Sequence, residues 1–198
     1  MDDISRRNFM VTSVGVAAGA LLLPSHTNAK EQSSVYQGGL VTGHPKPLLY
    51  KSIPGFLSEE QIAPHHTAHY GGALRGYFAA DKKLQLGITE GTSIDTSAYG
   101  AVQRARTNKA NSVLLHELYF DGITAKASKP NGEINIAIEK RFGSIEKWAN
   151  DFQESAKAAT GWVILAYYPL NGNLYNIVSD KHATGVLWMA TPLAHLSI

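Results

Sequence analysis

The stretch from Asn111 to Ile123, NSVLLHELYFDGI, constrains the fold of this chain more than any other. Its apolar residues recur at spacings of three and four, as they do along one face of an α-helix. His116 lies in the middle of that face, where we expect its side chain to be buried. A buried imidazole needs a hydrogen-bond partner or a metal ion. Two interpretations stay open, a core histidine bonded to a backbone carbonyl and a metal ligand.

The pair His116-Glu117 also matches the start of the zinc-protease pattern, in which a second histidine follows the first by four residues. This chain has Phe120 at that position, so this helix does not supply both ligands. A second metal ligand therefore has to come from another part of the chain.

Composition removes several classes of site. The 198 residues include no cysteine, which excludes disulfides, thiolate metal ligands and thiol nucleophiles. The net charge of +2 gives no argument for nucleic-acid binding, so we expect no nucleic-acid partner. Hydrophobic residues make up 44% of the chain, which is enough for a globular core. The eight histidines are the one compositional excess, and they turn attention to metal binding.

A first long helix is predicted over residues 59–84. Ser58 is a good N-cap for it, and Gln61 stands where a capping box requires it. The internal Gly71-Gly72 pair predicts a break, a bend or a close helix contact, because each glycine destabilises a helix by about 1 kcal/mol relative to alanine.

His65 and His69 lie four residues apart on this helix and therefore share a face. Such a pair binds metal in some proteins and faces solvent in others, so the spacing leaves both interpretations open. Residues 97–106 are expected to form a separate short helix before the helix of His116, which ends near Gly122. The two histidine-bearing helices and their modest connector predict an antiparallel helical hairpin.

A second half of the chain begins at the turn-forming residues 129–132, KPNG. Residues 133–142 predict a short helix that Gly143 terminates. Ser144 then caps a longer helix, whose apolar residues follow a strong helical period.

Strand patterns follow these helices. Residues 162–168, WVILAYY, are a continuous apolar run of strand formers, and residues 174–178 predict a second strand after the turn at Asn171-Gly172. A third strand is expected to begin at 186–189 and to continue through Leu193. Taken alone, this half is also compatible with a plain helix-and-hairpin packing unit.

These elements predict an α+β fold, with an N-terminal antiparallel helical hairpin followed by a C-terminal α/β domain that has a small antiparallel sheet. The expected segments are a signal peptide at 1–29, an extended lead-in at 30–55, a helical hairpin domain at 56–128 and the C-terminal domain at 129–198.

The first 29 residues have the organisation of an export signal. A charged start is followed by an apolar run over 11–23 and by a polar stretch that ends at Ala29, near which we expect cleavage. The pair Arg6-Arg7, followed by a polar residue and Phe9, resembles a twin-arginine signal. An ordinary secretory peptide is the alternative. The resemblance implies export by the twin-arginine translocase to the periplasm or another extracytoplasmic compartment.

The order of elements in the mature chain resembles the iron/manganese superoxide dismutase family. The segments that match are LSEEQIAPHHTAHY at 57–70, NSVLLHELYF at 111–120, and the stretch from GEINIAIEKRFGS to GWVIL at 132–165. The resemblance implies conversion of superoxide to hydrogen peroxide and oxygen by redox cycling of an iron or manganese ion, one per subunit, in a homodimer.

The family holds its metal with three histidines and one aspartate. By position, the resemblance assigns the first two histidine ligands to His65 and His116, with His66 as the fallback for the first. His69 becomes a residue of the active-site pocket, and Trp162 lines the site. The tyrosine that gates substrate is assigned to Tyr77, although strict spacing gives Ala73 and Tyr70 is also near.

The chain departs from the family pattern at its end. The family supplies the aspartate and third histidine from D-x-W/Y-E-H after a strand reading TPLL. Here Thr191-Pro192-Leu193 is present, but the aspartate position falls on Ser197 and the printed sequence stops at Ile198. We therefore expect a truncated or frameshifted chain whose C-terminal domain is incomplete and whose dismutase activity is low.

Two other classes of function remain as alternatives. One is a non-catalytic scaffold or binding module of the same fold that has lost its metal site. The other is a metal-dependent hydrolase, which no general-base carboxylate beside the histidines supports. The sequence does not distinguish iron from manganese.

Overall fold

The computed structural model describes residues 37–89, 95–126, 128–182 and 191–197. The expected signal peptide at 1–29 and the expected start of the third strand at 186–189 lie outside these residues. A short helix, α2 (Gly39–Thr42), occurs within the segment that we expected to be extended. It ends after one turn because Gly43 takes a left-handed conformation with a φ of 77°.

The first long helix is continuous but not uniform. It consists of α3 (Glu59–Pro64), the π-helical turn η1 (His65–Tyr70) and α4 (Gly71–Thr89). The predicted capping box is present, since the Ser58 N–H donates to Oε1 of Gln61 at 3.0 Å. The irregularity that we expected at Gly71-Gly72 lies one turn earlier, as the π-helical turn η1, and both glycines belong to the first turn of α4.

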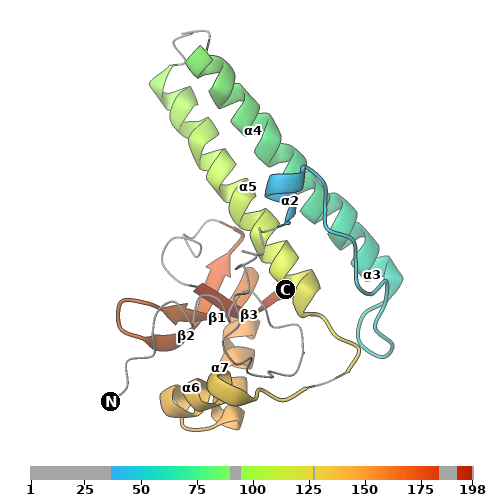
Figure 1. Ribbon diagram of the computed structural model, residues 1–198, viewed down its shortest axis with the longest axis vertical. Helices are drawn as coiled ribbons and strands as arrows, with labels where there is room; N and C mark the ends of the chain where they lie inside the picture. Colours follow the sequence, from blue (N-terminus) through green and yellow to red (C-terminus); the bar gives the residue numbers. More distant parts are fainter. Residues whose placement is uncertain (1–36, 90–94, 127, 183–190, 198) are drawn as a thin grey trace, which may run out of the picture. The chain divides into compact units, whose positions relative to one another are not determined.

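The second long helix is α5 (Thr96–Gly122), and it ends at the predicted residue. The separate short helix expected at 97–106 is wrong, because this segment is the first part of α5. Asp95 caps the helix by accepting a hydrogen bond from the Ala98 N–H, and Arg106 pairs with Asp81 of α4 at 3.0 Å. The predicted antiparallel hairpin is confirmed, with α4 and α5 side by side (Figure 1).

Both helices of the second half start within one residue of the predicted position, and the first ends where predicted. Helix α6 (Gly132–Phe142) ends at Gly143, whose φ of 88° suits glycine. Helix α7 (Ile145–Ala158) starts at Ser144, whose hydroxyl accepts a hydrogen bond from the Lys147 N–H.

The sheet contains β1 (Gly161–Tyr168), β2 (Asn173–Asp180) and β3 (Thr191–Ser197) in the order β2-β1-β3, with both pairings antiparallel. The predicted turn at Asn171-Gly172 joins the first two strands, and Gly172 has a φ of 69°. The central position of β1 explains its unbroken apolar run, because both of its faces are covered.

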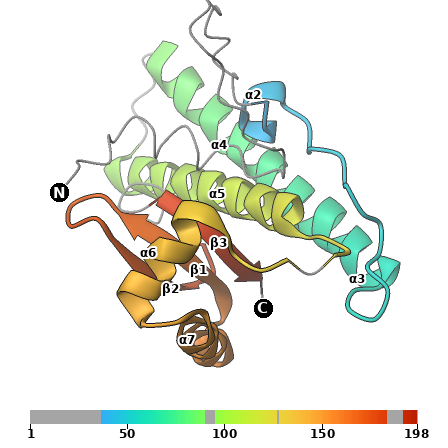
Figure 2. The same ribbon diagram turned by 60° about the horizontal axis from the view of Figure 1, so that its bottom comes forward.

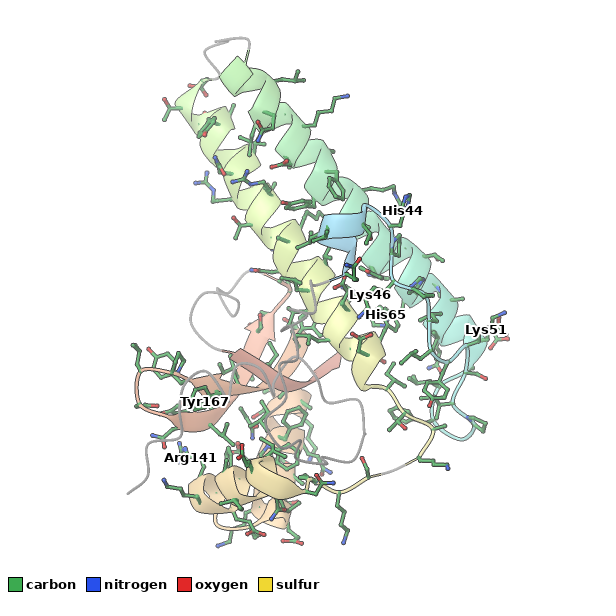
Figure 3. The ribbon with its side chains drawn as sticks, in the orientation of Figure 1. His44, Lys46, Lys51, His65, Arg141 and Tyr167 are labelled. Atoms are coloured by element: carbon green, nitrogen blue, oxygen red, sulfur yellow. The ribbon has the colours of Figure 1, made fainter. Side chains whose placement is uncertain are left out.

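Alternate residues of β1 face two different helical layers (Figure 2). Ile164 and Ala166 pack with Leu115 of α5. Leu165 packs with Ile138 of α6 and with residues of α7, and Tyr167, labelled in Figure 3, belongs to this second face. The structure therefore confirms the α+β class, with the sheet between the hairpin and the α6–α7 pair. Among the described residues, no helix is both long and apolar enough to cross a bilayer.

Candidate metal centre

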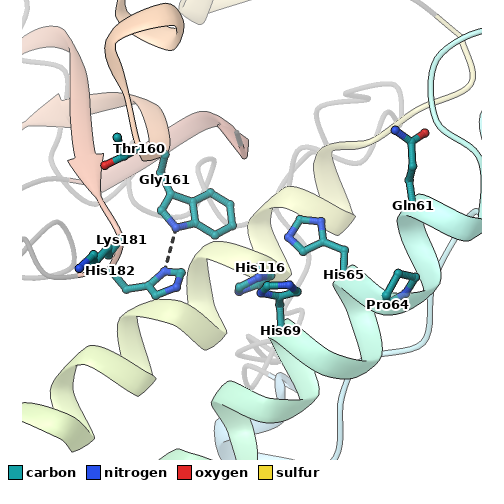
Figure 4. Close-up of a pocket in the computed structure, with 10 residues that line it drawn as sticks. Gln61, Pro64, His65, His69, His116, Thr160, Gly161, Lys181 and His182 are labelled. Atoms are coloured by element: carbon teal, nitrogen blue, oxygen red, sulfur yellow. Dashed lines mark hydrogen bonds between the residues drawn. The ribbon is translucent and has the colours of Figure 1, made fainter.

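An open cleft of about 470 Å³ lies where η1, α5 and the start of β1 meet (Figure 4). Four of its lining residues are histidines: His65, His69, His116 and His182. The hairpin supplies the first three, and the turn after β2 supplies the fourth. The fold therefore gathers imidazoles from segments more than a hundred residues apart in the sequence.

His65 and His116 approach each other from the two arms of the hairpin. Their ring centroids are 4.9 Å apart and their planes are inclined by 72°. His66 points elsewhere, since its Nε2 lies 2.7 Å from the backbone oxygen of Lys46. The structure thus places His65 beside His116 and gives the fallback, His66, a bond to the N-terminal segment.

The hydrogen bonding of His116 suits a ligand. Its side chain is buried, and its Nδ1 lies 2.7 Å from the backbone oxygen of Ser112. A carbonyl only accepts hydrogen bonds, so Nδ1 must carry the proton, and the neutral ring keeps a lone pair on Nε2. The two interpretations of His116 are therefore compatible, because a backbone bond of this kind also orients metal-binding histidines.

Burial keeps both rings neutral. It lowers the pKa of His65 to about 4, helped by the neighbouring His69 and His66. Burial likewise lowers the pKa of His116 to about 3, although the bond to Ser112 opposes this shift. At neutral pH both imidazoles are in the unprotonated form that binds metal ions.

The other assigned residues divide into two groups. His69 lines the cleft with its ring 5.7 Å from that of His65, and Trp162 lines it with its ring 5.0 Å from that of His116. Tyr77 is not among the lining residues, and its ring packs edge-on against Phe78. Its gating role stays a prediction.

The alternatives for the tyrosine do not occupy the cleft either. Ala73, at the strict spacing, is buried in the core of the hairpin. Tyr70 is buried in the same core and donates its hydroxyl hydrogen to Glu117.

His182 is a site residue that the sequence reasoning missed. Its Nδ1 accepts a 2.8 Å hydrogen bond from Nε1–H of Trp162, and its ring centroid lies 5.7 Å from that of His116 (Figure 4). Burial, followed by the charge of Lys109, lowers its pKa. It stands in a turn outside any periodic pattern, so only its spacing from Trp162 across the β1–β2 hairpin would have indicated it.

Tyr119 also lies beside the site, although its sequence pattern predicts only a place on the apolar face of its helix. Its ring lies 5.0 Å from that of His65 and 6.2 Å from that of Trp162. Burial raises the pKa of its hydroxyl, which therefore stays protonated at neutral pH.

The cleft offers two side chains that suit iron or manganese as ligands. His65 and His116 offer imidazole nitrogens, which suit both metals. Within the described part of the chain, no three side chains of histidine, cysteine, aspartate or glutamate converge as a metal-binding group. The position that the resemblance gives to the aspartate is Ser197, which is in register with Trp162 across β1 and β3. The strand register therefore brings that position to the same end of the sheet as the cleft.

Comparisons with known proteins agree with this arrangement. Residues 130–198 match the family described as iron/manganese superoxide dismutases, C-terminal domain. The chain is 32% identical over 155 residues to superoxide dismutase (Mn) 2 of Haloferax volcanii, which covers 78% of this chain and 76% of that protein. It is 34% identical over 130 residues to a superoxide dismutase (Fe) of Cupriavidus metallidurans, or 64% of each chain.

A third relative, superoxide dismutase (Fe) of Pyrobaculum aerophilum, is 32% identical over 143 residues, which cover 70% of this chain and 66% of that protein. The chain belongs to the iron/manganese superoxide dismutase family, whose cofactor is an iron or manganese ion.

Proposed function

We propose that this protein is a superoxide dismutase that converts superoxide to hydrogen peroxide and oxygen. The observation that carries the proposal is the contact of the His65 and His116 rings, both neutral, at the floor of a cleft that Trp162 borders. The names of the relatives support the same activity.

His65 and His116 would hold the iron or manganese ion through their imidazole nitrogens. A bound ion of this kind supplies one-electron exchange, by which one superoxide is oxidised to oxygen and a second is reduced, with two protons, to hydrogen peroxide. The hydrogen bond from His116 to Ser112 fixes the orientation of that ring before any ion binds.

The remaining residues of the cleft bind the substrate and hold protons. Lys181 lines the cleft and places a positive charge where an anion enters. Because Nδ1 of His182 accepts from Trp162, the neutral ring carries its proton on Nε2, which becomes a donor. Trp162 is buried and excludes water from one wall.

The finer parts of the proposal rest on sequence resemblance. We propose that residues 1–29 direct export by the twin-arginine translocase to the periplasm, on the basis of the Arg6-Arg7 pattern. We also propose a homodimer with one metal ion per subunit and a gating role for Tyr77.

A non-catalytic binding module of the same fold is the second candidate. It is favoured by one observation, namely that the described residues offer two close imidazoles and no third metal-binding side chain in the same group. This candidate predicts a folded protein without bound metal.

Metal analysis combined with a superoxide assay separates the candidates. The purified chain should bind iron or manganese after reconstitution and should consume superoxide at a low rate that chelation abolishes. The His65→Gln variant should lose both properties. A folded wild-type chain that binds neither metal and leaves superoxide decay unchanged would support the binding module and overturn the enzyme.

A further inference from the structure

A buried carboxylate lies directly beside the candidate ligand His116, and the proposed chemistry does not use it. Glu117 is 3% exposed. Its Oε1 accepts two hydrogen bonds, one from the Tyr70 hydroxyl at 2.6 Å and one from the Gly39 N–H at 2.7 Å. Burial of a carboxylate costs desolvation free energy, which these two hydrogen bonds partly offset.

Tyr70 is the partner that connects Glu117 to the other arm of the hairpin. Its side chain is 1% exposed, and its hydroxyl also accepts a 2.9 Å hydrogen bond from the Lys46 N–H. Burial and the bond to Glu117 raise the pKa of Tyr70, so the hydroxyl stays protonated and continues to donate.

Two neighbouring residues of α5 thus contact the two ends of one turn. His65 begins η1 and meets His116, while Tyr70 ends η1 and bonds to Glu117. The Tyr70 ring also lies parallel to that of His116, at 6.2 Å and 13°. A movement of η1 relative to α5 would break the Tyr70–Glu117 hydrogen bond and would also separate His65 from His116.

Residues that precede the first long helix donate two further hydrogen bonds to Glu117 and Tyr70. The segment between α2 and α3, which carries His44, Lys46 and Lys51, runs back along the first helix (Figure 3). The Lys46 N–H of this segment donates to the Tyr70 hydroxyl oxygen, and the Gly39 N–H at the start of α2 donates to the Glu117 carboxylate. A Cβ atom at Gly39 would lie 3.0 Å from the Tyr70 hydroxyl oxygen, a tight contact that glycine avoids.

We propose that the Tyr70–Glu117 hydrogen bond is a positioning device, which holds η1 against α5 in the register at which His65 and His116 share one site. Tyr70 and Glu117 act through the histidines and touch no substrate. The consequence for metal binding rests on the proposed function, whereas the placement of the two rings does not.

The test compares variants that keep or remove the bond. Tyr70→Phe removes the donor, and Glu117→Met removes the acceptor at nearly constant size. Glu117→Gln keeps a carbonyl oxygen that accepts from both partners and should behave as the wild type. Asp81→Ala removes the ion pair with Arg106 that links α4 and α5 at the far end of the hairpin. Leu84→Ala lowers the stability of the hairpin at a buried position of α4 that lies outside the cluster containing Tyr70.

The first measurement needs no metal. Nuclear Overhauser contacts between the ring protons of His65 and His116 should be present in the metal-free wild type, in Glu117→Gln and in both controls. They should disappear in Tyr70→Phe and in Glu117→Met. If Glu117→Met does not fold, Tyr70→Phe alone decides the matter. Unchanged contacts in a folded Tyr70→Phe protein, or their loss in Leu84→Ala, would overturn the proposal.

The second measurement is the Kd for Mn²⁺ alone. We expect Tyr70→Phe to weaken binding about tenfold, as removal of a residue that orients a ligand typically does, and Glu117→Gln to bind Mn²⁺ as the wild type does. A wild-type chain that shows the ring contacts but binds no Mn²⁺ would contradict the proposed function and leave the positioning role supported. A wild-type chain that binds Mn²⁺ with an affinity that Tyr70→Phe does not change would overturn the positioning role.

Discussion

The indole Nε1–H of Trp162 donates a 2.8 Å hydrogen bond to Nδ1 of His182. This bond joins the start of β1 to the turn after β2, at the edge of the cleft. Because Nδ1 of His182 is the acceptor, the neutral ring carries its proton on Nε2.

Trp162→Phe should therefore free Nδ1 of His182 and destabilise the protein by more than the ~1 kcal/mol of one hydrogen bond, because the smaller ring also leaves part of a buried site empty. Nitrogen chemical shifts of the His182 ring would report the change of tautomer. Trp148→Phe is the matched control, since that indole donates to Asn176 on the opposite side of the sheet. Equal shifts of the His182 nitrogens in both variants would contradict the assignment.

His65→Gln should abolish metal binding, whereas His66→Gln should retain it. The two residues are adjacent, but only His65 meets His116, while His66 bonds to the backbone of Lys46. Metal content per subunit, measured after reconstitution with iron or manganese, provides the comparison. Loss of metal from the His66 variant with retention in the His65 variant would show that the ligand is the other histidine.

The metal-free protein should lose stability as the pH falls below about 6.5, the pKa of an unfolded histidine. The folded pKa values are lower, about 4 for His65 and about 3 for His116, so the unfolded state binds more protons in between. The free energy of unfolding therefore falls with decreasing pH, by about 1.4 kcal/mol per unit for a fully buried group such as His116. The slope levels off below the folded pKa values.

Urea titrations at a series of pH values measure this slope. The His65→Gln, His116→Gln double variant should have a flatter profile between pH 4 and pH 6.5. An equally steep profile in the double variant would assign the pH dependence to other groups.

Ile164→Ala should cost between about 2 and 5 kcal/mol of stability, because Ile164 is completely buried between β1 and α5. Val178→Ala, at a position on β2 that is 38% exposed, should cost less than 1 kcal/mol. Denaturant midpoints compare the two. Similar losses at both positions would be inconsistent with a sheet covered by the hairpin.

Replacement of both Arg6 and Arg7 by lysine should stop export, because the proposed translocase signal depends on the arginine pair. Cell fractionation with an antibody against the mature chain measures the distribution. Unchanged secretion would indicate an ordinary secretory signal, the alternative that the sequence leaves open.

Local signals in the sequence determined most element types and several boundaries. The capping box at Ser58, the glycine at 143 and the cap at Ser144 act through atoms within a few residues, so they can be read without a structure. The continuous apolar run of β1 likewise predicted a strand, and the structure shows that both of its faces are covered. The continuity of α5 was missed, because the polar residues before Asn111 show no apolar period that joins them to the helix of His116. In the structure, Arg106 of this polar part pairs with Asp81 of α4.

Only the tertiary structure decided which histidines meet. The sequence places His65 and His66 side by side, and the π turn together with the Tyr70–Glu117 bond selects His65 to face His116. His182 joins the cleft because the β1–β2 pairing returns the chain to Trp162. Contacts of this kind depend on packing between distant segments, whose register no local periodicity encodes.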